Sequence, residues 1–233
     1  MKFLYLLLDI GSFSIPFFFS FHPKLKFYRY WKPLALGTMI TMLIFIPWDI
    51  FFTTNNIWGF NDNYLIGIKI LSLPLEEWLF FILIPYACIF MHFALVELFP
   101  KIELQRKSSN IITNILIMVF ALIAISNYDK WYTLVNFSYA TLLLIIVKIY
   151  NPGILKYYFL TFLVMLVPFF IVNGILTGSF IENHVVWYNN AENLKLRLFT
   201  IPIEDMVYAF SLILTNLSII QFLYQKMKLP TSK

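Results

Sequence analysis

"SLPLEEWLFF" at residues 72–81 decides how this chain is interpreted, because it places two adjacent acids at the start of a long apolar run. "TIPIEDMVYAF" at residues 200–210 repeats the arrangement. The four acids of these two motifs are Glu76, Glu77, Glu204 and Asp205. An ionisable side chain at a membrane boundary costs free energy, so each pair is a candidate functional group.

The composition around the motifs predicts a membrane protein. Of the 233 residues, 61% are hydrophobic, 20% are aromatic and only 12% are charged. Soluble domains carry about 25% charged residues, so this chain cannot cover a globular surface with polar groups. We expect an all-α, polytopic membrane protein. Its net charge of +5 then reflects basic cytoplasmic loops, and we expect no nucleic-acid partner.

Seven apolar runs approach the roughly 20 residues that a membrane-crossing helix needs. They lie near residues 3–21, 34–53, 74–98, 110–127, 132–149, 156–173 and 202–224. Only "NYDKWY" separates the fourth run from the fifth, which predicts a tight helical hairpin.

The basic residues predict the orientation of the helices. Twelve Lys and Arg residues fall in loops on the side of the C-terminus, and five fall on the other side. The positive-inside rule therefore places the N-terminus outside and the C-terminus in the cytoplasm, which we take to be that of a bacterial cell with the chain in its inner membrane. Both acid pairs then lie at the outer ends of their helices.

The two motifs belong to a longer duplication, in which one constant offset aligns several types of residue. Without a gap, Phe60-Asn61 aligns with Tyr188-Asn189, Lys69 with Arg197, and Pro74 with Pro202. We expect one membrane domain, 1–233, containing two parallel three-helix repeats, about 1–100 and 129–233, joined by a connector helix at about 101–128. Parallel repeats often share a site at their interface.

A purely local role for the motifs is the first alternative. Ser72 or Thr200 could cap a helix, proline suits a first helical turn, and acids there favour the helix dipole by roughly 0.3–1 kcal/mol. However, a cap needs one acid, and both copies keep two. Adjacent helical residues point about 100° apart, so one acid of each pair can face the bundle. Shielded from water beside aromatic rings, such a carboxyl can stay protonated and act as a general acid.

Two further polar residues lie near the same level of the membrane. Asp49 follows Pro47 in "IPWD", and Asn173 follows Pro168 in the sixth run. An acid near a helix C-terminus opposes the dipole, which favours a functional role for Asp49. Asn173 could instead cap the end of its helix before Gly174.

These residues together resemble the membrane-embedded lycopene cyclase family. The resemblance rests on "PLEEWLFF" and "PIEDMVYAF" together with "IPWD" (46–49), "WGFN" (58–61) and "VWYN" (186–189), and it spans nearly the whole chain. Members of this type occur as two small subunits in some bacteria and fused to phytoene synthase in fungi. Here both halves lie in one chain.

The resemblance implies a reaction of carotenoid biosynthesis, that of a lycopene β-cyclase, an isomerase of the intramolecular lyase type. A proton adds to the terminal C1–C2 double bond of lycopene, the 5,6 double bond closes the ring, and loss of a proton from C6 gives a β-ring. No cofactor or metal is implied. The substrate partner is lycopene dissolved in the bilayer, and contact with other carotenoid enzymes would fit the same pathway.

The resemblance also assigns roles to residues. Glu76 and Glu204 are expected to be the central carboxyls, with Glu77 and Asp205 as partners that share the proton. Asp49 and Asn173 are expected to position them. The aromatic rings expected to face the cation are Trp48, Trp58, Phe80, Trp187, Tyr188 and Tyr208.

Three alternatives remain at this level: a proton-coupled seven-helix transporter, an assembly subunit whose acids are only caps, and a cyclase that forms ε- or γ-rings on a longer carotenoid. Four properties also stay open: the number of ends cyclised, the ring type, which carboxylate is acid and which is base, and the oligomeric state.

Overall fold

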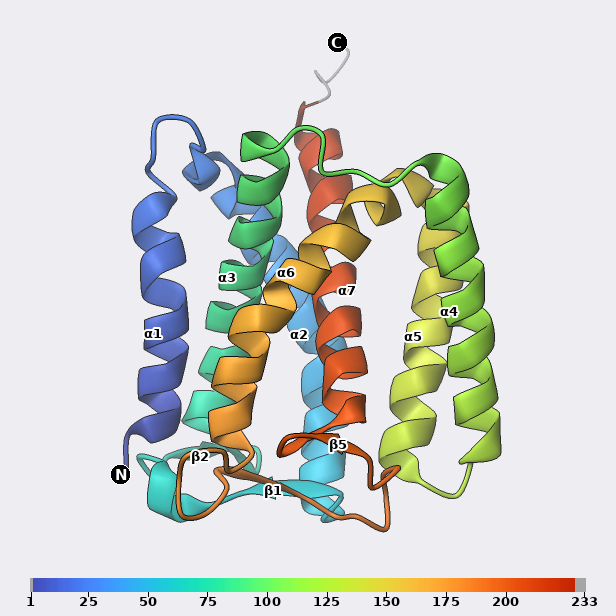
Figure 1. The fold of residues 1–233 in the computed structure, drawn as a ribbon. Helices are drawn as coiled ribbons and strands as arrows, with labels where there is room; N and C mark the ends of the chain where they lie inside the picture. The colour runs from blue at the N-terminus through green and yellow to red at the C-terminus, as the bar shows by residue number, and fades with distance from the viewer. Residues whose placement is uncertain (1, 229–233) are drawn as a thin grey trace.

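Seven α-helices stand side by side in the computed structural model, which describes residues 2–228 (Figure 1). This confirms the predicted fold class. The helices are α1 (Leu4–Phe19), α2 (Trp31–Thr54), α3 (Leu75–Leu98), α4 (Arg106–Ser126), α5 (Trp131–Tyr150), α6 (Pro152–Leu176) and α7 (Ile203–Lys228). Two short 3₁₀ helices, η1 (Phe27–Tyr30) and η2 (Asp62–Tyr64), lie in the loops.

Helices α2 to α7 are long and apolar enough to cross a membrane, as expected of an integral membrane protein. Helix α1 is shorter than the expected run at 3–21. It has 16 residues, or about 24 Å at 1.5 Å per residue. It ends at Phe19 because the chain turns at Ser20 towards His22-Pro23, and a residue before proline is disfavoured in helical conformation.

Six short strands lie in the two loops that precede α3 and α7. The strands are β1 (Trp58–Phe60), β2 (Lys69–Ile70), β3 (Leu73–Pro74), β4 (Val186–Tyr188), β5 (Arg197–Leu198) and β6 (Ile201–Pro202). Each strand of the second loop follows its counterpart in the first by the same offset as the acid motifs. The hairpin registers match as well, since Lys69 pairs with Pro74 and Arg197 with Pro202. The same tight turn therefore precedes each acid pair.

Strands β1 and β4 join the two halves of the chain. They pair antiparallel, with Trp58 opposite Tyr188 and Gly59 opposite Trp187. A Cβ atom on Gly59 would overlap the indole ring of Trp187, so only glycine fits at this position. We call this two-stranded pair the β1–β4 ribbon. Trp58 and Tyr188 come from different halves of the chain and, as directly opposed residues, lie on the same face of this ribbon.

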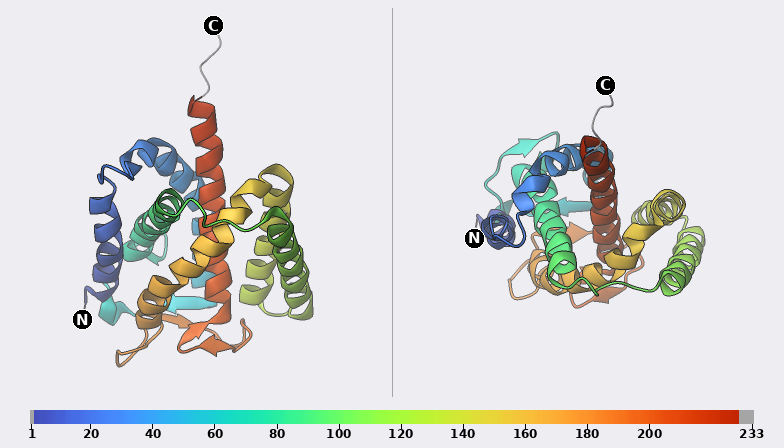
Figure 2. Two further views of the ribbon diagram at one scale, coloured as in Figure 1. Left: turned by 45° about the horizontal axis from the view of Figure 1, so that its top comes forward. Right: turned by 90° about the horizontal axis from the view of Figure 1, so that it is seen from above.

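The helices of the two halves also cross-pack. Within each half the first helix packs on the third, α1 on α3 and α5 on α7. Each middle helix packs on the third helix of the other half, α2 on α7 and α6 on α3. Helices α3 and α7 therefore lie near the centre of the bundle, while α4 pairs with α5 as the expected hairpin at one side (Figure 2).

The loops divide clearly between the two ends of the bundle. The N-terminal end of α1 and all the strands of the described chain lie at one end, which we call the strand end (Figure 1). The turn containing η1, the α3–α4 connection, the α5–α6 junction and the C-terminal end of α7 lie at the other end.

We expect Gly59→Ala to lower the free energy of unfolding by about 1–3 kcal/mol, because the added methyl group must displace the Trp187 ring. Thermal unfolding of purified protein in detergent measures the change. Gly11→Ala is the control, since a Cβ there meets nothing within 4 Å and alanine favours a helix. Equal midpoints for Gly59→Ala and the unchanged protein would contradict the close packing of the ribbon.

Candidate active site

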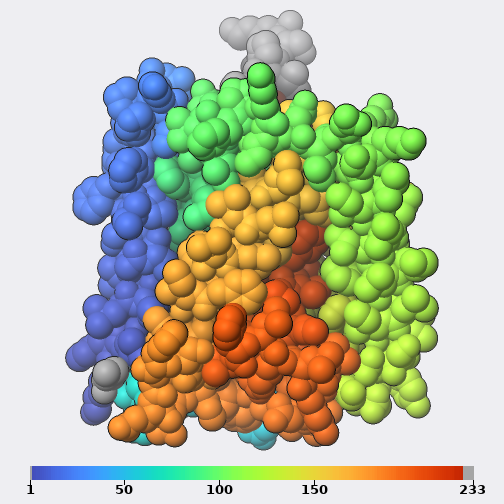
Figure 3. Space-filling view, in the orientation of Figure 1, coloured from blue at the N-terminus to red at the C-terminus, as the bar shows by residue number. Residues whose placement is uncertain are grey.

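A cavity of about 640 Å³ lies between α1, α3, α6 and α7. Its wall follows α3 from Glu77 to Leu98, a rise of about 32 Å at 1.5 Å per residue. Leu7 and Ile15 of α1 and Ile171 of α6 line it and are also exposed on the outer surface of the helices. The cavity therefore opens sideways, towards the membrane, on the face shown in Figure 3, where atoms of α3 are visible between α1 and α6.

The polar groups of the cavity gather at the strand end. Most of the wall is formed by Leu, Ile, Val, Met, Ala and Phe side chains. The polar and amphipathic residues that line the strand end are Tyr5, Trp58, Glu77, Tyr132, Asn173, Tyr188, Asp205 and Tyr208. This arrangement suits a long hydrocarbon whose reacting part lies at one end, because apolar walls bind the chain and a few polar groups meet its terminus.

Glu77 is one of two acids that reach the cavity. Its Oε2 accepts a hydrogen bond from the hydroxyl of Tyr5 at 2.6 Å. The buried carboxyl of Asp49 also lies close enough to Glu77 for the two charges to interact. The indole Nε1 of Trp58 donates to Asp49 Oδ1 at 2.8 Å and holds that carboxyl in place. Glu77 and the buried Asp49 thus form a pair of neighbouring carboxyls.

Asp205 is the second acid of the cavity, and its surroundings differ. The hydroxyl of Tyr132 donates to Oδ1 at 2.6 Å, and the hydroxyl of Tyr188 donates to Oδ2 at 2.7 Å. The amide Nδ2 of Asn173 also donates to Oδ2, at 2.8 Å. Three donors to one carboxyl offset part of the cost of burying its charge.

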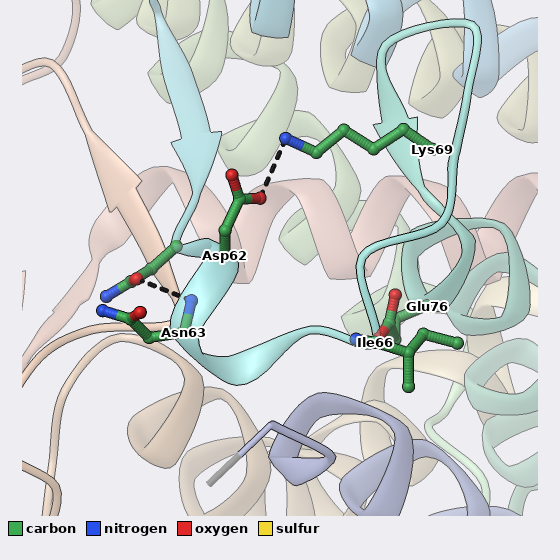
Figure 4. A network of polar contacts seen from close by, with 6 residues as sticks. Asp62, Asn63, Ile66, Lys69 and Glu76 are labelled. Atoms are coloured by element: carbon green, nitrogen blue, oxygen red, sulfur yellow. Dashed lines mark hydrogen bonds and ion pairs between the residues drawn. The ribbon is translucent and has the colours of Figure 1, made fainter.

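The other acid of each motif holds a loop. Glu76 Oε1 accepts the backbone N–H of Ile66 at 2.7 Å, in the loop that also contains the Asp62–Lys69 ion pair (Figure 4). Glu204 Oε1 accepts the backbone N–H of Leu194, also at 2.7 Å. Neither residue lines the cavity. The central position expected for Glu76 and Glu204 is taken by Glu77 and Asp205, because consecutive helical side chains point about 100° apart.

The comparison with known families decides the identity of the chain. The family model described as "Lycopene cyclase" matches residues 2–95 and 129–223. The chain belongs to the lycopene cyclase family. No curated protein and no solved structure matches it. Family membership makes this chain a carotenoid cyclase. The two matched regions contain α1, α2, α5, α6 and most of α3 and α7, with every acid described above.

In this cyclase local capping does not account for all the contacts of the motif acids. Helix α3 has no side-chain cap at its N-terminus, and each loop-holding acid accepts an N–H from a residue ten positions before it in the sequence. Asn173 does not end α6, which continues to Leu176, and its side chain reaches Asp205 instead.

Four of the six aromatic residues expected at the site line the cavity of the cyclase: Trp58, Phe80, Tyr188 and Tyr208. Trp48 lies behind Tyr208, with ring centroids 5.1 Å apart, and Trp187 packs over Gly59 on the opposite face of the ribbon. Neither forms part of the cavity wall. Within residues 2–228, no three His, Cys, Asp or Glu side chains are grouped to hold a metal ion.

Sequence reasoning missed Tyr5 and Tyr132, which donate to the two cavity acids. Each tyrosine lies on the first helix of its half, and the offset between them is close to that between the acid motifs. Extending the internal alignment upstream would have found them. Asp49 and Asn173 complete the correspondence, since each lies beside the cavity acid on a middle helix.

We expect Glu204→Ala to release the loop that contains Leu194, because a backbone N–H then loses a charged acceptor worth about 1.5–3 kcal/mol. Limited trypsin digestion should cleave at exposed Lys195 and Arg197 several times faster than in the unchanged cyclase. Glu204→Gln keeps an acceptor oxygen and should digest almost normally. If all three proteins are cleaved at one rate, Glu204 does not hold this loop.

Proposed function

We propose that this cyclase is a lycopene β-cyclase that works by acid–base isomerisation without a cofactor. The observation that supports it is a pair of acids with opposite surroundings, Glu77 and Asp205, at one end of a lipid-open apolar cavity. The substrate is a hydrocarbon, so the enzyme needs one proton donor, one proton acceptor and dry walls.

In this proposal Glu77 donates the proton. Two neighbouring buried carboxyls repel each other when both are ionised, so Glu77 and Asp49 together are expected to keep one proton. Transfer of that proton to C2 of the terminal double bond leaves a tertiary cation at C1. Once the shared proton has left, Glu77 and Asp49 are both ionised. The cation at C1 forms beside them, and its positive charge reduces the repulsion between the two carboxylates.

Asp205 completes the reaction as the base. The 5,6 double bond attacks C1, forms the C1–C6 bond and moves the cation to C5. A carboxylate stabilised by three donors can then take the proton from C6, which gives the C5–C6 double bond of a β-ring. One proton is added and one is removed, so the net change is an isomerisation.

The aromatic rings of the cavity support the cation during ring closure. Trp58, Tyr188 and Tyr208 line the same end of the cavity as the two acids. A desolvated ring stabilises a cation by roughly 0.5–2 kcal/mol. The surrounding apolar side chains exclude water, which would otherwise trap the cation as an alcohol.

The same proposal includes an orientation and a domain organisation. The basic loops lie at the end opposite the strands, which favours a cytoplasmic C-terminus and an outer N-terminus in a bacterial inner membrane. The acids would then act near the outer surface. We further propose a single membrane domain of two three-helix repeats, with α4 as the connector.

Replacement of either cavity acid tests the mechanism. We expect Glu77→Gln and Asp205→Asn to reduce ring formation by about 10²–10⁴-fold, because each removes a proton-transfer group. The assay supplies lycopene to cyclase in liposomes without flavin or nicotinamide, in heavy water, and separates the products by chromatography. One deuterium per ring is expected.

Glu204→Gln is the matched control, since it neutralises an adjacent acid outside the cavity and should keep most of the activity. Normal ring formation by both cavity-acid variants would show that these carboxyls do not transfer the proton. Unchanged lycopene with well-folded, unmodified protein would favour the transporter or assembly alternatives.

A further inference from the structure

The turns of the two hairpins that precede α3 and α7 carry large, exposed apolar side chains. The β2–β3 hairpin turns at Leu71-Ser72, and the β5–β6 hairpin turns at Phe199-Thr200. Leu71 is 66% exposed and Phe199 is 87% exposed. We call each of these residues, with its two exposed apolar neighbours, an apolar tip: Ile68, Ile70 and Leu71 in the first half, and Leu196, Leu198 and Phe199 in the second. The two tips correspond at the offset of the acid motifs.

Both turns use a backbone conformation that does not suit their residues. The angle φ is 50° at Leu71 and 57° at Phe199, which is the left-handed region. A Cβ atom is crowded in this region, so two-residue hairpin turns of this kind favour Asn and Gly. A turn that faced only water would gain stability from those residues. Large apolar side chains at both turns therefore indicate that the side chains themselves have a role at the surface.

The second tip lies against the membrane-crossing part of α6. The hydroxyl of Thr200 donates to the carbonyl of Gly174 at 3.2 Å, and the rings of Phe199 and Phe170 have centroids 6.3 Å apart. Phe170 lies six residues, or about 9 Å, before the end of α6. It is one turn from Val167, which is 63% exposed on the outside of the bundle. The second tip therefore continues the lipid-facing surface of α6.

The first tip is held beside α3 in a similar way. The indole Nε1 of Trp78, in the first turn of α3, donates to the carbonyl of Ile70 at 3.1 Å. The first backbone N–H of α3 donates to Ile68 O at 2.9 Å, and the first N–H of α7 makes the equivalent bond to Leu196 O at 3.1 Å. Both hairpins therefore lie beside the helix ends, whereas β1 lies beyond them (Figure 1).

Each hairpin also carries one exposed cation, Lys69 in the first and Arg197 in the second. Successive residues of a strand point to opposite faces, so each cation points away from the apolar side chains on either side of it. Lys69 pairs with Asp62 at 2.8 Å, and Arg197 Nη1 donates to the carbonyl of Thr200 at 2.7 Å. Long basic side chains can reach lipid phosphates while their apolar neighbours enter the membrane interface. This pattern is complementary to a lipid surface.

We propose that the two apolar tips insert into the bilayer interface at the strand end and anchor this end of the cyclase at a fixed depth. Acyl chains contact Leu71 and Phe199, and lipid phosphates contact Lys69 and Arg197. Each acid pair follows its tip directly in the sequence, so the anchors also set the level of the acids in the membrane. The anchoring does not depend on the reaction proposed above.

Spin labels on the tips test the insertion. Cys88→Ala removes the single cysteine of the chain, and Leu71→Cys or Phe199→Cys then carries the label in liposomes of phosphatidylcholine and phosphatidylglycerol. Relaxation of the label by oxygen, compared with relaxation by a water-soluble nickel complex, gives its depth. We expect both labels about 5–10 Å below the lipid phosphates.

Asn63→Cys and Ala191→Cys are the matched controls. Both residues are exposed, lie in the same two loops and correspond at the same offset. Labels on them should lie in water and be relaxed mainly by the nickel complex. Ile70→Cys and Leu198→Cys repeat the measurement at a second position of each tip, so that a label that disturbs one turn does not decide the result.

Three results would overturn the proposal. If the tip labels meet the nickel complex as readily as the control labels, the tips face water. If they are shielded from both reagents and show spin–spin broadening between molecules, a second copy of the chain covers the tips. If only one tip lies below the phosphates, the two hairpins do not act as a pair of anchors.

Discussion

A carboxyl buried among membrane helices must either keep its proton or accept several hydrogen bonds, and this constraint organises the strand end of the cyclase. Asp205 meets it with three donors, and Glu77 is expected to meet it by keeping one proton together with the neighbouring Asp49. Two further acids, Glu76 and Glu204, meet it by holding backbone N–H groups of the loops. The loops are ordered by the same acids that they shield from water.

The arrangement of buried acids and loops occurs once in each half of the chain, but the residues around the acids differ between the two halves. The strands, hairpin turns and loop-holding bonds recur at one constant offset along the chain. At two positions beside the acids, however, the first half has Asp9 and Asp49 where the second has Asn136 and Asn173. An amide donates without titrating, whereas a carboxyl can carry a proton. This difference agrees with the proposed mechanism, in which the first half supplies the proton and the second half accepts one.

The cross-packing of the helices places these two chemistries against one substrate. Each middle helix packs on the third helix of the other half, and the β1–β4 ribbon closes the strand end from both halves. The cavity between α1 and α6 remains open to the bilayer and is otherwise apolar. In the proposed mechanism a carotenoid enters sideways with its chain along α3, and its end group meets the acids, the tyrosines and Trp58.

The sequence by itself determined the seven helices, the repeat and the family, because apolar runs, a regular spacing and the P-x-E-[ED] motif are local patterns in the chain. Only the tertiary structure decided which acid of each motif faces the cavity. That choice depends on the rotation of α3 and α7 about their axes, which packing against α6 and α2 sets. Contacts such as Tyr5 with Glu77 join residues 72 positions apart, so no local pattern contains them.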